Sequence, residues 1–342
     1  MALNRLRTTK SLVSVYVCDI GVVMKQVFMK SIGETTSRIG FGCASLGSRI
    51  GSREGINALE RAYTAGVTWY DVAPSYGDGM AESIVGEFGF DKRDRVHICT
   101  KVGMAPPRTP AVMRALKPLT RIAIAGVPTL KQYAVKVRPV PYKVSLTAES
   151  IQLSVENSLR RLRTDYIDVL ALHRPSLDEL IREDIIRAIE SLIQNGKARA
   201  VSVAGDVEAG LAALCRDLPY KIVQIANTAL TPNLTKMKVK ADFQKDIITY
   251  GTFSCIRPVS AAIESRREIA AALAKLGYSG SPNEVAAAFL ADFSFATNLD
   301  GVTLVSMFGK EHLKFNLSRL QIHPKPECFH PVLAALGANA AA

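Results

Sequence analysis

The sequence lacks three features that would place it in common classes of protein. No apolar stretch is long enough to cross a membrane. No nucleic-acid-binding module is visible, so the net charge of +12 does not by itself indicate a nucleic-acid partner. The cysteines show no paired spacing, which argues against a disulfide scaffold or a metal site; they are Cys18, Cys43, Cys99, Cys215, Cys255 and Cys328. We therefore expect a cytoplasmic protein with free thiols.

Acidic residues are missing from one long segment. Between Val102 and Thr147 the chain has eight lysines or arginines and no aspartate or glutamate. The segment is rich in proline and interrupts the pattern of regular elements, so we interpret 102–147 as a basic insertion. It is either a solvated loop, a lid that favours an anionic group on the substrate, or a contact for an acidic partner.

The N-terminus has some features of a secretory signal, because Arg5, Arg7 and Lys10 precede the apolar stretch Ser11–Val17. Asp19 interrupts that stretch, and no clean cleavage pattern follows. We expect residues 1–23 to be a disordered extension and residues 24–322 to form one domain. Residues 323–342 would be a C-terminal tail, frayed after Pro331.

What the sequence does contain is an alternation of β-branched apolar runs with helical patterns. This alternation predicts a parallel sheet built from βα units, and eight such units close a (β/α)8 TIM barrel. The strands are expected near 38–44, 67–72, 95–101, 165–172, 198–204, 221–226, 247–251 and 301–306. The helices are expected near 54–66, 80–89, 147–162, 178–195, 206–217, 233–246, 259–277, 282–293 and 310–320.

Two further elements bear on the fold. Lys25–Ile32 followed by Gly33-Glu34 predicts a short N-terminal hairpin that plugs the bottom of the barrel. Gly40-Phe41-Gly42 raises the alternative of a doubly wound dinucleotide-binding sheet. That alternative is weak because the third glycine of the fingerprint is replaced by Ser45, and Glu60 lies within a predicted helix.

Polar side chains end three of the predicted strands. Asp71 follows Val67–Tyr70, Lys101 follows Val96–Thr100, and His173 follows Tyr166–Leu172. Tyr76 lies five positions after Asp71. A charged group at the end of a buried strand is costly unless it is paired or lies in a pocket, so these residues indicate one polar site on the barrel rim.

This set of residue types supports proton transfer to a carbonyl oxygen. A phenol has a reference pKa of about 10. We expect the Lys101 ammonium, kept charged by Asp71, to move the pKa of Tyr76 toward neutral pH. His173 would orient the substrate oxygen or relay the proton.

With these residues the chain resembles the aldo-keto reductase family. Asp71, Tyr76, Lys101 and His173 match that family's tetrad in type, order and strand context, and the resemblance runs from about Lys25 to Leu320. Matching neighbours are Ser37–Gly42, Glu82 after Tyr76-Gly77, Ser158–Leu162, Asp165–Asp168 and Asn195–Ala200. The resemblance implies an enzyme that uses NADP(H) or NAD(H), with Tyr76 as general acid/base and Asp71 also placed near the nicotinamide ribose.

The cofactor residues that the resemblance implies match only in part. Gln224 corresponds to the family's nicotinamide-binding glutamine, but Ala204-Gly205 replaces its usual Ser-Asn pair. Its stacking aromatic position appears as Asn227 in this sequence, and Gly251-Thr252-Phe253 replaces Ser-Pro-Leu.

On the adenine side of the cofactor, Asn316 matches the family pattern. The usual cations for the 2′-phosphate of NADP fall at Ser306 and His312, which leaves Lys310 as the nearest fixed charge.

The resemblance thus implies an NAD(P)-dependent oxidoreductase acting on a small-molecule carbonyl, namely an aldehyde, a ketone or a sugar hemiacetal or lactone. The basic insertion would favour an anionic substrate. The alternative is a non-catalytic, regulatory protein that binds a nicotinamide cofactor on the same fold and has lost activity with the altered nicotinamide platform.

Overall fold

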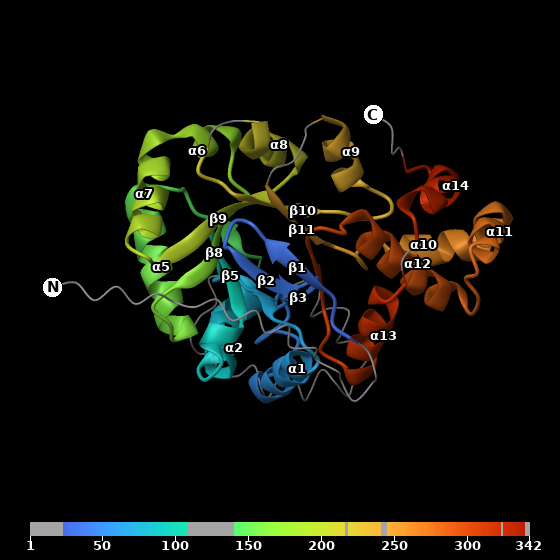
Figure 1. The fold of residues 1–342 in the computed structure, drawn as a ribbon, viewed down its shortest axis with the longest axis horizontal. Helices are drawn as coiled ribbons and strands as arrows, with labels where there is room; N and C mark the ends of the chain where they lie inside the picture. The colour runs from blue at the N-terminus through green and yellow to red at the C-terminus, as the bar shows by residue number, and fades with distance from the viewer. Residues whose placement is uncertain (1–22, 108–139, 216–217, 241–244, 323, 339–342) are drawn as a thin grey trace.

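Eight parallel strands close into a barrel in the computed structural model, which describes residues 23–107, 140–215, 218–240, 245–322 and 324–338 (Figure 1). Around the barrel the strands follow the order β10-β11-β12-β3-β4-β5-β8-β9. The predicted (β/α)8 barrel is confirmed, and the doubly wound alternative is wrong. The barrel strands are β3 (Ile39–Gly42), β4 (Trp69–Asp71), β5 (His97–Val102), β8 (Ile167–His173), β9 (Ala198–Gly205), β10 (Ile222–Ala226), β11 (Asp246–Tyr250) and β12 (Val302–Val305).

Helices surround the barrel (Figure 1). They are α1 (Ser52–Thr64), α2 (Ala81–Gly89), α5 (Ala148–Leu162), α6 (Leu177–Ile181), α7 (Glu183–Gln194), α8 (Val207–Cys215), α9 (Asn233–Lys240), α10 (Ile256–Ser265), α11 (Arg267–Lys275), α12 (Pro282–Thr297), α13 (Lys310–Leu320) and α14 (His330–Ala335). Short 3₁₀ turns lie at Tyr76–Gly79, Arg93–Arg95 and Pro326–Phe329.

Two of the predicted helices are divided. The one expected over 178–195 forms α6 and α7, because Arg182 between them has an extended backbone (φ −67°, ψ 125°). The one expected over 259–277 forms α10 and α11, which are separated at Arg266 (φ −123°, ψ 105°). Neither break has a glycine or proline at the dividing residue, so the usual sequence signal for a helix end is missing.

The helix starts follow from local hydrogen bonding. Ser281 and Glu284 form a reciprocal capping box at the start of α12, with Pro282 at the first helical position. Thr147 forms the equivalent pair with Ser150 at α5. Asp206 Oδ1 accepts from the backbone N–H of Ala209 at 2.9 Å and so caps α8.

The N-terminal hairpin closes one end of the barrel. β1 (Gln26–Met29) pairs antiparallel with β2 (Glu34–Ser37), and Met29 is fully buried in the same cluster as the barrel residues Trp69, Val169 and Ile222. The predicted hairpin plug is confirmed.

Charged groups fasten this hairpin to the barrel. Asp246 accepts from the backbone N–H groups of Lys30 and Ser31, the shorter of the two contacts being 2.7 Å. Arg199 binds Glu34 at 2.6 Å and donates to the carbonyl of Ile32 at 2.8 Å. These interactions attach the hairpin to the lower end of the barrel, the end that contributes to stability in this fold.

The insertion and the tail are only partly described. Met104–Ala105 (β6) pairs antiparallel with Tyr142–Lys143 (β7), so the two ends of the insertion are held together. Most of the insertion 102–147, namely residues 108–139, lies outside the described residues, and so do residues 1–22 of the extension predicted over 1–23. Among those described, no helix is long and apolar enough to span a bilayer.

The predicted fraying of the tail after Pro331 is wrong up to Ala338. Helix α14 follows the turn Pro326–Phe329, and Phe329, Val332 and Leu333 are buried in the core formed with α10–α12. These apolar residues give the tail enough buried surface to order it.

The hairpin plug makes a prediction about stability. Met29→Ala should lower the free energy of unfolding by about 2–5 kcal/mol, because it leaves a cavity in the barrel interior. The matched control is Phe28→Ala on the opposite face of the same strand, where the side chain is 57% exposed. Chemical denaturation measures both variants, and equal losses would contradict the plug's contribution to the core.

Candidate active site

Three of the four residues predicted to form the polar site lie at or next to the ends of three adjacent barrel strands. Asp71 ends β4, Lys101 is the fifth residue of β5, and His173 ends β8. β5 pairs with both β4 and β8, so these side chains come from neighbouring strands. Tyr76 begins the 3₁₀ turn that follows β4. The four residues lie at the carboxyl end of the barrel, where the fold gathers functional groups.

Asp71 and Lys101 form a buried ion pair. Each is 3% exposed, and Lys101 Nζ lies 2.5 Å from Asp71 Oδ1. The ammonium also donates to the carbonyl of Val72 at 3.1 Å, and Gln224 Nε2 donates to Asp71 Oδ2 at 2.6 Å. Burial alone would lower the pKa of Lys101, but the Asp71 carboxylate together with Tyr76 and Cys99 outweighs it, and the pKa is raised. Lys101 therefore stays charged at neutral pH.

Tyr76 lies between the ion pair and His173. Lys101 Nζ is 5.1 Å from the centroid of the Tyr76 ring, and the rings of Tyr76 and His173 meet edge to face with centroids 6.1 Å apart. Burial raises the pKa of Tyr76 to about 12, although Lys101 lowers it. The expectation of a pKa near neutral is wrong because desolvation of the phenolate exceeds the attraction of an ammonium that Asp71 already neutralises.

His173 is held in the neutral form. Burial, together with the nearby charges of Lys101 and Arg174, lowers its pKa to about 3. A neutral imidazole can donate one hydrogen bond and accept another, but it brings no positive charge to the site.

A cavity of about 1290 Å³ contains the tetrad and most of the expected cofactor positions. Eight of the residues expected from the sequence line it: Asp71, Tyr76, Lys101, His173, Gln224, Gly251, Thr252 and Ser306. Its volume exceeds the few hundred to about 1,000 Å³ common for small-ligand pockets, so it has room for a large ligand or for two ligands together.

Several polar atoms at these positions are buried without a hydrogen-bond partner among the described residues. They are His173 Nδ1, Gln224 Oε1 and Thr252 Oγ1, whose residues line the cavity, and Asn316 Oδ1, whose residue lies outside its lining. A buried polar atom left without a partner costs free energy, and such atoms in a cavity indicate a ligand that supplies the missing bonds.

Three expected cofactor residues lie outside the lining of this cavity. Lys310 and His312 are exposed in the first turn of α13, and Asn316 is buried one turn further along the same helix. The backbone N–H groups at the start of a helix favour an anion, so the location suits a phosphate.

Asn227, the position that corresponds to the family's stacking aromatic, does not line the cavity. Asn227 is buried, donates to Thr297 Oγ1 at 3.0 Å and accepts from the backbone N–H of Leu234. Tyr250, the last residue of β11, lines the cavity instead and is 37% exposed. Sequence reasoning missed Tyr250, although an aromatic residue directly before Gly251 at a strand end was a visible signal.

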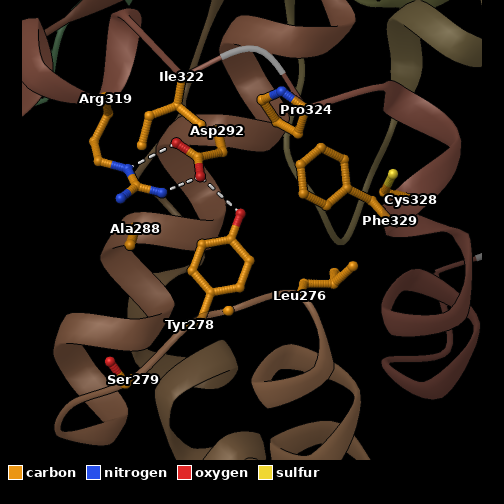
Figure 2. A pocket seen from close by; sticks show the side chains of 11 residues that line it. Leu276, Tyr278, Ser279, Ala288, Asp292, Arg319, Ile322, Pro324, Cys328 and Phe329 are labelled. Atoms are coloured by element: carbon orange, nitrogen blue, oxygen red, sulfur yellow. Dashed lines mark hydrogen bonds and ion pairs between the residues drawn. The ribbon is translucent and has the colours of Figure 1, made fainter.

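A second cavity of about 400 Å³ lies among α11, α12, α13 and the C-terminal turn (Figure 2). Tyr278 and Arg319 both point toward Asp292 there (Figure 2). Arg319 Nε lies 2.8 Å from Asp292 Oδ1, Arg319 Nη2 also contacts Oδ2, and the Tyr278 hydroxyl donates to Oδ2 at 2.7 Å. These groups satisfy one another, so the cluster anchors α12 to α13.

Comparison with known proteins assigns the chain to a family. The sequence model of the aldo/keto reductase family matches residues 38–327. The chain belongs to the aldo/keto reductase family.

Curated relatives include two sugar dehydrogenases. D-threo-aldose 1-dehydrogenase of a Pseudomonas species is 28% identical over 194 residues, covering 55% of this chain and 56% of the relative. L-galactose dehydrogenase of Arabidopsis thaliana is 27% identical over 193 residues, covering 53% and 50%. This aldo/keto reductase thus spans about half the length of the curated relatives it matches.

Solved structures agree on the fold of this aldo/keto reductase. An aldo-keto reductase of Klebsiella pneumoniae, in complex with NADPH, superposes with a TM-score of 0.62 at 22% identity, covering 89% of this chain and 92% of that one. The holo form of an aldo-keto reductase of Bacillus halodurans superposes with a TM-score of 0.64 at 18% identity, covering 93% and 97%.

The low pKa of His173 makes a prediction about pH. The folded state binds this proton with a pKa of about 3, whereas the unfolded chain binds it near 6.5. Stability is therefore lost as pH falls below about 6.5, and His173→Gln should remove this loss. Denaturation of both proteins at about pH 7 and about pH 5 should show the variant gaining relative stability on acidification. A His173 ring signal titrating near 6.5 by NMR would contradict the neutral assignment.

Proposed function

We propose that this aldo/keto reductase transfers a hydride between NADP(H) or NAD(H) and a carbonyl compound, namely an aldehyde, a ketone or a sugar hemiacetal or lactone. The observation that carries the proposal is the single cavity in which the buried pair Asp71–Lys101, Tyr76 and His173 lie beside the expected cofactor positions. The aldo/keto reductase assignment of the chain supports the same chemistry.

The residues present fit a nicotinamide cofactor. Gln224 Oε1, Thr252 Oγ1 and Asn316 Oδ1 are buried polar atoms without partners among the described residues. Gln224 would hold the carboxamide, Asn316 the adenine end, and Ser306 with the first turn of α13 a phosphate. When bound, the cofactor supplies or accepts the hydride.

Tyr250 is the aromatic side chain best placed to cover the nicotinamide ring. It lines the cavity at the end of β11, and Lys101 and Asp71 both act on its pKa, which burial raises. The glutamine amide and this ring would together orient the cofactor in place of the missing Ser-Asn pair.

The tetrad residues divide the work on the substrate. Tyr76 is protonated at neutral pH and donates its proton to the substrate oxygen during reduction, or accepts it as phenolate during oxidation. Lys101 favours the phenolate, and Asp71 fixes Lys101 in place. Neutral His173 orients the carbonyl oxygen by a hydrogen bond without repelling Lys101.

Polyhydroxylated substrates fit the other side chains of the cavity. Asp206, Glu208 and Asn233 line it and offer carboxylate and amide groups to hydroxyls. Sugar dehydrogenases among the relatives support an aldose as the substrate. The competing function is cofactor binding without catalysis, which is favoured by Ala204-Gly205 in place of the family's usual Ser-Asn pair.

Tyr76→Phe tests the acid/base role. The variant should lose about 10²–10⁴-fold in kcat, because the substrate oxygen no longer receives a proton. The dissociation constant for NADPH should stay near that of the wild type. The matched control is Tyr166→Phe, which removes a phenol outside the cavity and should keep full turnover.

The same experiment separates the two functions. A panel of aldehydes and aldoses, followed by NADPH absorbance, should show turnover by the wild type. NADPH binding without turnover of any member would favour the non-catalytic function, and full turnover by Tyr76→Phe would remove that residue from the mechanism.

The raised pKa of Tyr76 predicts opposite pH profiles for the two directions. Reduction needs the phenol, which persists to a pH of about 12, so its rate should be flat with pH across the neutral range. Oxidation needs the phenolate, so its rate should rise about tenfold per pH unit. Initial rates in both directions between about pH 6 and 9 test this.

Lys101→Met extends the test. Removing the ammonium raises the pKa of Tyr76 further, because Lys101 is the group that lowers it. Oxidation should then slow more than reduction at any pH, and its rise should move to higher pH. Profiles that superimpose on those of the wild type would show that Lys101 does not tune the phenol.

A further inference from the structure

Charged side chains line the catalytic cavity, namely Arg49, Asp71, Lys101, Arg174, Asp206 and Glu208. Asp71 and Lys101 neutralise one another at 2.5 Å, and Asp206 is engaged as the cap of α8. Arg174 also lines the cavity, is exposed, and has no carboxylate within ion-pair distance among the described residues. The adjacent insertion 102–147 contains no acidic residue that could pair with it.

The backbone holds Arg174 in a fixed position beside the tetrad. Its N–H donates to the carbonyl of Ala204 at 2.7 Å, which extends the pairing of β8 with β9 one residue past His173. Its φ is +57°, a left-handed conformation that costs about 1–2 kcal/mol for a residue with a side chain. Asparagine or glycine would meet this conformation more easily than arginine.

The guanidinium also acts on the reacting end of the site. Arg174 and Lys101 are the two charges that contribute to lowering the pKa of His173. Lys101 is paired with Asp71, whereas Arg174 has no ion-pair partner among the described residues. Arg174 also acts on the pKa of Tyr250, so its guanidinium lies near two residues of the cavity.

We propose that Arg174 forms an oxyanion subsite next to the reacting carbonyl and selects substrates that carry a carboxylate or phosphate group. The planar guanidinium can bind two oxygens of such a group at once, which an ammonium cannot do. This inference rests on the proposed function, and it assigns substrate selection to a residue outside the tetrad. It does not depend on the conformation of the insertion.

The experiment compares substrates that share a carbonyl core. One pair is 4-carboxybenzaldehyde and benzaldehyde, and the other is glyceraldehyde 3-phosphate and glyceraldehyde. For the full-length wild type, kcat/KM with NADPH should favour the charged member of at least one pair by about tenfold or more, as for a hydrogen bond to a charged group. The pair with the larger ratio distinguishes carboxylate from phosphate.

Arg174→Asn removes the positive charge, and asparagine tolerates the left-handed backbone conformation at this position. The ratio of charged to neutral kcat/KM should fall about ten- to a hundredfold, chiefly through KM for the charged member. The melting temperature should stay the same or rise, because asparagine relieves the backbone strain. A stable variant thus excludes unfolding as the cause.

Arg187→Asn provides the matched control. Arg187 lies on α7 outside the cavity, with a 69% exposed side chain paired to Glu183. It changes the net charge by the same amount and should leave the ratio unchanged. Repeating the series at high salt removes long-range steering by the basic insertion, and the difference between wild type and Arg174→Asn should persist.

The outcomes separate this proposal from the proposed function. Equal ratios for Arg174→Asn and the wild type, or a wild-type ratio near one while the neutral aldehydes turn over, would overturn the subsite and leave the reductase activity standing. A wild type that turns over no carbonyl compound would overturn both.

Discussion

The buried pair of Asp71 and Lys101 is the interaction on which the rest of the site depends. Removing two charges from water costs several kcal/mol per ion. The pair is stable because neighbouring groups form hydrogen bonds with both charged side chains. Asp71 accepts from Lys101 at 2.5 Å and from Gln224 at 2.6 Å, while Lys101 also donates to Val72. β4 and β10 lie on opposite sides of the closed barrel. The Gln224 bond therefore spans it and couples the expected cofactor residue to the group that holds Lys101.

The barrel separates the chemistry from much of the stability. At the lower end, the hairpin buries Met29 and is fastened by Asp246 and Arg199. At the upper end, polar atoms such as Gln224 Oε1 and His173 Nδ1 are buried without partners among the described residues. Strain and unpaired polar groups at a functional end of a barrel persist when the rest of the structure supplies the stability.

Sequence reasoning succeeded where a residue type was costly at its position. Charged or titratable groups ending three strands placed the tetrad, and alternating patterns placed all eight barrel strands. It failed where the answer depends on three-dimensional surroundings. The pKa of Tyr76 is set by burial that no spacing reveals. The family resemblance placed the stacking position at Asn227, whereas Tyr250 reaches the cavity from the next strand. The tail appeared frayed from its alanines, but Phe329 orders it.

Neutral His173 carries one ring proton, and the surroundings of its two nitrogens indicate which of them holds it. Nδ1 is buried without a partner among the described residues, whereas Nε2 is not among these buried atoms and His173 lines the cavity. An orphaned N–H is less tolerated in a protein interior than an orphaned acceptor, so the proton belongs on Nε2. His173 is then a neutral donor on the side open to the substrate, and Tyr76 is a second neutral donor. In the proposed reaction, two neutral donors beside Arg174 would favour negative charge developing on the carbonyl oxygen, without an imidazolium that Lys101 would repel.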